Sequence, residues 1–147
     1  MKVLFIHQNM PGQYVHIAHH LAQTGHEVGF ITQPRAAEIA GVRKLEYQPV
    51  PASGTGHAYT RELDSGVANG LAVARLCEWL ARDGFVPDVV IGHNGWGEIL
   101  YVKDIWPHTP LLGYFEFFYR PSGTDVDFIP NFPRNRTRLY GCAPAMR

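Results

Sequence analysis

Short apolar runs alternate with longer amphipathic segments along this chain, and this alternation limits its possible folds more than any other feature. The apolar runs are continuous rather than alternating in polarity, which is typical of strands buried on both faces. We predict strands over residues 2–7, 27–32, 42–50, 88–92 and 110–114, and helices over 13–24, 36–40, 60–82 and 96–105. The expected fold is therefore α/β, with a doubly wound, mostly parallel, Rossmann-like sheet.

Composition fits one domain and excludes several classes of protein. A length of 147 residues with 46% hydrophobic residues suits a single packed core. The 13 basic and 13 acidic residues cancel, so we expect no nucleic-acid partner. Cys77 and Cys142 form no disulfide or metal-ribbon pattern. Without a signal-peptide core or a membrane-spanning run, we expect a cytoplasmic protein, either free or in peripheral contact with the inner face of the plasma membrane.

The loop after the first predicted strand is a candidate ligand site, because doubly wound sheets bind ligands at the carboxyl ends of their strands. It contains neither a dinucleotide fingerprint nor a phosphate loop. Pro11 and Gly12 lead directly into a predicted helix, whose free backbone N–H groups could receive a ligand. An ordinary strand-to-helix turn also explains these residues.

The segment of residues 92–98 is the most unusual in the chain. Its three glycines would let the backbone approach a ligand, and His93 can donate, accept or hold a proton near neutral pH. We predict that His93 contacts a ligand, because a strand-end histidine between glycines has little packing to do. Glu98 adds a carboxylate at the expected start of a helix. In the alternative interpretation, Trp96 fills the core and Glu98 only interacts with the helix dipole.

An aromatic run at residues 114–120 contains one carboxylate and one guanidinium, Glu116 and Arg120. These two side chains could line a sugar-sized cleft. They could also pair with each other within a packed aromatic patch. The sequence alone leaves both interpretations open.

Clustered histidines and arginines provide weaker candidates. His16 and His20 share one face of a predicted helix but lack a third ligand, so we predict a solvated face and no metal site. Arg134, Arg136 and Arg138 alternate near the end of the chain. A solvated face is preferred there too, over a membrane-facing patch.

Four segments carry a joint resemblance to a known family: residues 1–13 (MKVLFIHQNMPGQ), 24–28 (TGHEV), 91–98 (IGHNGWGE) and 114–119 (YFEFFY). Together they resemble the N-terminal domain of bacterial glycosyltransferases of family four. The resemblance implies a GT-B fold, in which two Rossmann-like domains face each other across a cleft. Residues 1–147 would be the acceptor-side domain, with the C-terminal donor domain absent.

The resemblance also implies roles for individual residues. Pro11, Gly12 and Gln13 would approach donor and acceptor, and His93, as the catalytic residue, would contact the transferred sugar. The expected substrate-binding residues are Pro11, Gly12, Gln13, Asn94, Gly95, Glu98, Glu116 and Arg120. The reaction would be retaining, without metal or cofactor, and the leaving phosphate would help to deprotonate the acceptor. Residues 125–131 (DVDFIPN) depart from the family's more acidic stretch, which leaves the role of that loop open.

The leading hypothesis is a hexosyltransferase of polysaccharide biosynthesis that uses a nucleotide-sugar donor and a glycan or lipid-linked acceptor. The chain alone should be nearly inactive, because fixed positive groups must stabilise the leaving diphosphate and the family's donor-side motifs are absent. The alternative is a non-catalytic sugar or nucleotide binding or docking module, which could self-associate through the aromatic residues 115–119. A nicotinamide oxidoreductase has the least support.

Overall fold

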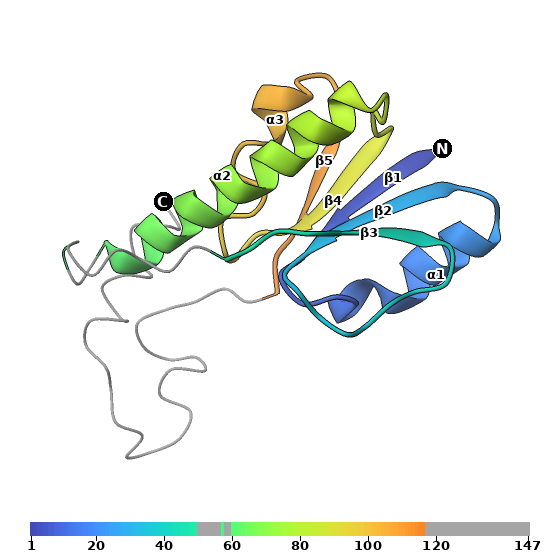
Figure 1. The fold of residues 1–147 in the computed structure, drawn as a ribbon, viewed down its shortest axis with the longest axis horizontal. Helices are drawn as coiled ribbons and strands as arrows, with labels where there is room; N and C mark the ends of the chain where they lie inside the picture. The colour runs from blue at the N-terminus through green and yellow to red at the C-terminus, as the bar shows by residue number, and fades with distance from the viewer. Residues whose placement is uncertain (50–56, 58–59, 117–147) are drawn as a thin grey trace, which may run out of the picture.

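One parallel sheet of five strands organises the chain in the computed structural model, which describes residues 1–49, 57 and 60–116. The strand order is β3-β2-β1-β4-β5 (Figure 1). The strands are β1 (Lys2–Ile6), β2 (Glu27–Thr32), β3 (Val42–Glu46), β4 (Val89–His93) and β5 (Leu111–Tyr114). The helices are the 3-10 turn η1 (Gly12–Tyr14), α1 (Val15–Gln23), α2 (Arg61–Arg82) and α3 (Val102–Ile105).

Both faces of the sheet are covered, which explains the continuous apolar runs. Figure 1 shows α1 on one face and α2 with α3 on the other. Leu4 and Ile6 of β1 belong to the core cluster that includes α2. Val3 and Phe5, which alternate with them, belong to the cluster that includes α1. The predicted doubly wound, Rossmann-like α/β fold is confirmed.

Two predicted helices are wrong in whole or in part. Residues 36–40 form no helix, and Ile39 packs into the α1-side core from an irregular segment. A helix of five residues has few hydrogen bonds to offset the cost of nucleation. The predicted helix 96–105 is reduced to α3, because Gly97 has a φ of +91° and so interrupts the helical backbone. The third strand is also shorter than predicted and ends at Glu46.

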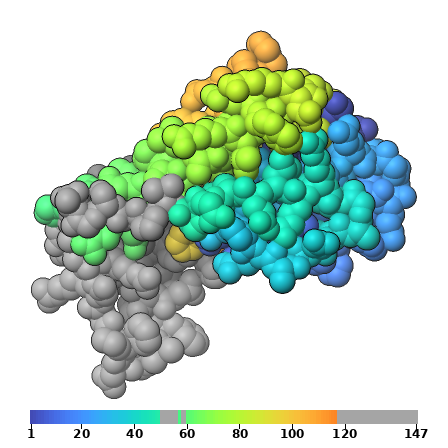
Figure 2. Space-filling model, viewed as in Figure 1, coloured from blue at the N-terminus to red at the C-terminus, as the bar shows by residue number. Residues whose placement is uncertain are grey.

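The segment around β3 forms one edge of the sheet. Figure 2 shows it at the surface beside α2. β3 pairs only with β2 within the described residues, in a register that sets Leu45 opposite Ile31. No helix of the described part of the chain is long and apolar enough to cross a membrane.

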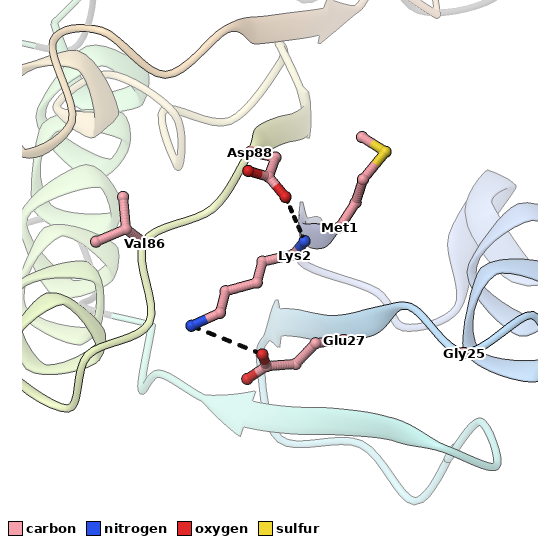
Figure 3. Close-up of a pocket in the computed structure, with 6 residues that line it drawn as sticks. All are labelled: Met1, Lys2, Gly25, Glu27, Val86 and Asp88. Carbon is pink, nitrogen blue, oxygen red and sulfur yellow. Dashed lines mark hydrogen bonds and ion pairs between the residues drawn. The ribbon is translucent and has the colours of Figure 1, made fainter.

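A surface hollow at the amino ends of the strands is drawn in Figure 3. Its charged groups bind one another. The Lys2 backbone N–H donates to Asp88 Oδ2 at 2.7 Å, and Lys2 Nζ lies 3.7 Å from Glu27 Oε2. These contacts tie β1 to its neighbours. Because ligands of such sheets bind at the carboxyl ends of the strands, the candidate site lies at the opposite edge.

Candidate functional site

The sheet changes its direction of winding between β1 and β4. From β1 the chain proceeds to β2 and β3 on one side, and it returns to add β4 and β5 on the other (Figure 1). A crevice outside the carboxyl ends at such a switch point is where open α/β sheets bind ligands. His7 directly follows β1, and His93 is the last residue of β4. Two histidines therefore flank the switch point.

The two imidazoles, which we call the histidine pair, contact each other. Ile6 is in register with Gly92, so the next residue of each strand lies alongside the other. The ring centroids are 5.0 Å apart, and the ring planes are inclined by 77°. Both histidines are only 6% exposed. This burial is consistent with fixed rings at the floor of a site rather than mobile side chains on a surface.

Hydrogen bonds determine which ring nitrogen of each histidine carries a proton. His7 Nδ1 accepts the Asn9 backbone N–H at 2.8 Å, and His93 Nδ1 accepts that of Gly95 at 3.1 Å. A nitrogen that accepts an N–H has no proton, so each neutral ring carries its proton on Nε2. His93 Nε2 lies 3.2 Å from Glu116 Oε2 and donates to it. His93 is therefore a hydrogen-bond donor toward the rim of the site.

Glycines make room for both rings. A Cβ at Gly12 would lie 3.1 Å from His7 Nδ1, and a Cβ at Gly95 would lie 2.7 Å from His93 Cε1. Real Cβ contacts are essentially never as close as the second value. Two of the glycines predicted to bind substrate thus have a packing role as well, which is to seat the histidine pair.

Tyrosines enclose the histidine pair on the α1 side. Tyr14 is 4% exposed, and its ring centroid lies 5.8 Å from that of His7. The ring centroid of Tyr114 lies 6.3 Å from that of His93. Burial raises the pKa of Tyr14 to about 12, and Tyr114 adds to this shift. Burial, followed by the neighbouring His93, lowers the pKa of His7, and contacts with Asn9, Glu116 and Gln13 offset part of the change. His7 therefore favours its neutral state.

Glu98 lies beneath the site rather than at the start of a helix, so that prediction is wrong. It is 1% exposed, and α3 begins only at Val102. Its Oε1 accepts the Tyr47 hydroxyl at 2.7 Å, and this hydroxyl accepts a hydrogen bond from Gln33. Oε2 has no hydrogen-bond partner among the described residues. Burial raises the pKa of Glu98, and Tyr47 and His93 counteract the shift only in part.

The loop of residues 94–101 rests on α2 at two glycines that sequence reasoning missed. A Cβ at Gly70 would lie 2.7 Å from the Gly97 carbonyl oxygen and 3.1 Å from the Tyr101 ring. Gly66, one turn earlier, is also next to Gly97. The available signal was two glycines four residues apart inside a regular helical pattern, which indicates close approach of another backbone. Trp96, interpreted above as possible core filling, is 49% exposed.

The predicted site residues within the described range gather at one edge. Those after β1 are Pro11, Gly12 and Gln13; those after β4 are Asn94, Gly95 and Glu98; and Glu116 follows β5. Glu116 pairs with His93. Its suggested partner Arg120, as well as Cys142 and the arginines at 134–138, lies outside the described residues. His7 was not predicted, although its place directly after the first strand was the available signal.

Charged and metal-binding groups are few near the histidine pair. Arg35 reaches the rim by donating to Asn9 Oδ1 at 2.8 Å. Across the described ranges, no group of three or more His, Cys, Asp or Glu side chains could hold a metal ion. His16 and His20 are both exposed on α1, which confirms the predicted solvated face. The arrangement combines two imidazoles with one carboxylate, a set suited to binding hydroxyl groups.

Comparison with known families gives a match over most of the chain. The family described as "Glycosyl transferase family 4 group" matches residues 24–143. A comparison with curated proteins found no match. The family match spans the histidine of β4, the loop that rests on α2, and Glu116.

Solved structures show the same fold. Phytolacca americana apo UGT2 superimposes with a TM-score of 0.55 at 19% identity, over 78% of this chain and 29% of that chain. The complex of the same enzyme with UDP-2fluoro-glucose and pterostilbene gives 0.55 at 16% identity, with the same coverage. The glycotransferase of kitacinnamycin gives 0.52 at 16% identity, over 82% of this chain and 31% of that chain. The chain thus has the fold of part of a GT-B glycosyltransferase and spans about three tenths of the length of these structures.

Proposed function

Because this chain belongs to the glycosyl transferase family 4 group, we propose that it is the acceptor-side domain of a glycosyltransferase. The enzyme would move a hexose from a nucleotide-sugar donor to a glycan or lipid-linked acceptor in polysaccharide biosynthesis. The reaction would be retaining and metal-independent, as the sequence resemblance implies. The observation that carries the proposal is the histidine pair at the switch point, with Glu116 hydrogen-bonded to His93.

The chemistry of this edge suits a sugar rather than a diphosphate. Glu116 can accept hydrogen bonds from hydroxyl groups, and its side chain is 40% exposed. The charged group bonded to the histidine pair is a carboxylate, which repels phosphate. Stabilising a leaving diphosphate needs fixed positive groups. We therefore propose that a second domain holds the nucleotide and that this chain alone is inactive.

His93 has the central role in this proposal. Its Nε2–H, which donates to Glu116 in the free chain, would donate instead to a hydroxyl of the transferred sugar, and Glu116 would accept from a neighbouring hydroxyl. Pro11, Gln13, Asn94 and Arg120 would complete the substrate contacts. The buried Glu98 would not contact the substrate. It would support the site through its hydrogen bond with the Tyr47 hydroxyl.

The cellular setting follows from the acceptor. A lipid-linked acceptor would bring a cytoplasmic enzyme into peripheral contact with the inner face of the plasma membrane. A polymer acceptor would not require this contact. The two cases differ in whether the complete enzyme sediments with vesicles that contain the lipid-linked acceptor.

A second candidate function is a non-catalytic binding or docking module. Exposed apolar side chains on and after β5 favour it: Leu112 is 61% exposed, Tyr114 41% and Phe115 74%. Such side chains are typical of an interaction surface. Sedimentation of the chain, together with titration by sugars and nucleotides, distinguishes the two. Self-association without any effect of His93 substitutions on transfer would favour docking.

The test is sugar transfer by a complete enzyme that contains this domain. His93→Ala should reduce transfer by about 10²-fold or more, the usual effect of removing a donor from a reacting site. His93→Gln, which keeps a donor near the position of Nε2, should retain part of the activity. His16→Ala, on the solvated face of α1, is the matched control. Equal activity of the His93 and His16 variants would overturn the proposal. Full-rate turnover by the 147-residue chain alone would contradict the proposed inactivity of the isolated domain.

A further inference from the structure

The same local arrangement occurs at two adjacent strand ends. The Nδ1 of His7, after β1, and the Nδ1 of His93, at the end of β4, each accept a hydrogen bond from the backbone N–H of the residue two positions later. Each ring also lies against a glycine, Gly12 for His7 and Gly95 for His93. The repetition places two imidazoles in one tautomer side by side. Among the described residues, His93 but not His7 has a carboxylate hydrogen-bond partner at the rim.

The His7 ring has contacts of its own that do not involve His93. Its Nδ1 accepts the Asn9 N–H, the ring of Tyr14 lies edge-on to it, a Cβ at Gly12 would lie 3.1 Å from its ring, and it is nearly buried. His93 depends at its outer end on Glu116, whose side chain is 40% exposed. The His7 ring is therefore fixed without His93, and its edge-on contact limits rotation of the His93 ring.

We propose that His7 is a positioning residue, whose ring holds His93 in the orientation and tautomer that present Nε2–H to the substrate. Rotating the His93 ring by half a turn would put Cδ2 in the place of Nδ1 and Cε1 in the place of Nε2, which would remove the acceptor of the Gly95 N–H and turn the donor away from Glu116. Without the His7 ring, the space beside His93 would permit that rotation. The proposal rests on the proposed function for its catalytic consequence, but not for the geometry.

Nuclear magnetic resonance of histidine side-chain nitrogens tests the geometry without any activity. In the unmodified chain, the His93 spectrum should show a protonated Nε2 and an unprotonated Nδ1. His7→Asn keeps an acceptor for the Asn9 N–H but removes the ring, and it should give His93 a mixed or exchanging signature. His7→Phe keeps the ring packing and should preserve the signature. His16→Ala is the control and should change nothing.

Two results would overturn the positioning role. One is an unchanged His93 signature in His7→Asn. The other is a signature lost in His7→Phe but kept in His7→Asn, which would assign the effect to the hydrogen bond with Asn9. If His7→Asn did not fold, His7→Gln and His7→Leu would replace it in the comparison, since both remove the ring and keep a side chain of similar volume.

Turnover by the complete enzyme tests the consequence. His7→Asn should lower kcat on the order of 10²-fold, as expected for a reacting group displaced by about 1 Å, with a smaller change in KM. His7→Phe should retain most of kcat. If His7→Phe lost turnover while its His93 signature stayed intact, His7 would contact the substrate itself and the positioning role would be refuted. If no variant altered transfer although the signatures changed, the proposed function would fail and the geometry would stand.

Discussion

Two glycines of α2 allow a matched test of how the loop after β4 is seated. Gly66 and Gly70 lie one turn apart on the same helix, and both face Gly97. Replacing either by alanine should give the same gain in helix propensity, about 1 kcal/mol. The variants differ in what the new methyl group meets. At Gly66 the nearest atoms are 3.7 Å away, an ordinary contact.

At Gly70 the methyl group would lie 2.7 Å from the Gly97 carbonyl oxygen, so the loop backbone must move. Overpacking of this kind costs about 1–3 kcal/mol. Gly66→Ala should therefore raise the free energy of unfolding by about 1 kcal/mol. Gly70→Ala should leave it unchanged or lower it by up to about 2 kcal/mol.

Urea unfolding of the two variants and the parent chain measures the difference. Equal slopes with denaturant concentration would show that stability alone has changed. The two variants should differ by about 1–3 kcal/mol, with Gly70→Ala the less stable. Equal stabilisation of both variants would refute the close approach of Gly97 to α2.

The buried carboxyl below the site yields two further predictions. Burial raises the pKa of Glu98 above its usual 4.5, so the folded chain favours the protonated form, and the free energy of unfolding should decline as pH rises from about 4.5 through the raised pKa. Glu98→Gln should remove this decline in urea titrations at several pH values, and an unchanged pH profile would contradict the burial of an ionisable group. Tyr47→Phe removes the hydroxyl that donates to Glu98 Oε1 and should lower the free energy of unfolding by about 1–3 kcal/mol. Combining it with Glu98→Gln in a double-mutant cycle should show coupling, and strict additivity would contradict the hydrogen bond.

The strands were predictable because their signals are local. β2 has the predicted bounds, since its apolar run is bordered by Gly25 on one side and by Pro34 shortly after the other end. β1 and α2 agree with prediction to within a residue at each end. In each case a continuous or helical apolar pattern coincides with burial in the core.

What could not be predicted depends on contacts between distant residues. The loop at Gly97 is shaped by α2, about thirty residues earlier in the chain. Glu98 is buried because Tyr47, 51 residues away, donates to it. His7 becomes a neighbour of His93 only through the strand order, which no local pattern specifies. His93 itself was identifiable, because it stands between glycines at a strand end.

The central claim is that ligands bind at the carboxyl edge between β1 and β4. Chemical-shift mapping of the isotope-labelled chain, with glucose and UDP-glucose as separate probes, tests this most directly. Glucose should perturb the backbone amides of Asn9 and Gly95 and the ring signals of His7 and His93, whose Nδ1 atoms accept hydrogen bonds from those amides, and UDP-glucose should do so through its glucose moiety. Unchanged signals there, or changes confined to the opposite edge around Lys2 and Asp88, would contradict the account.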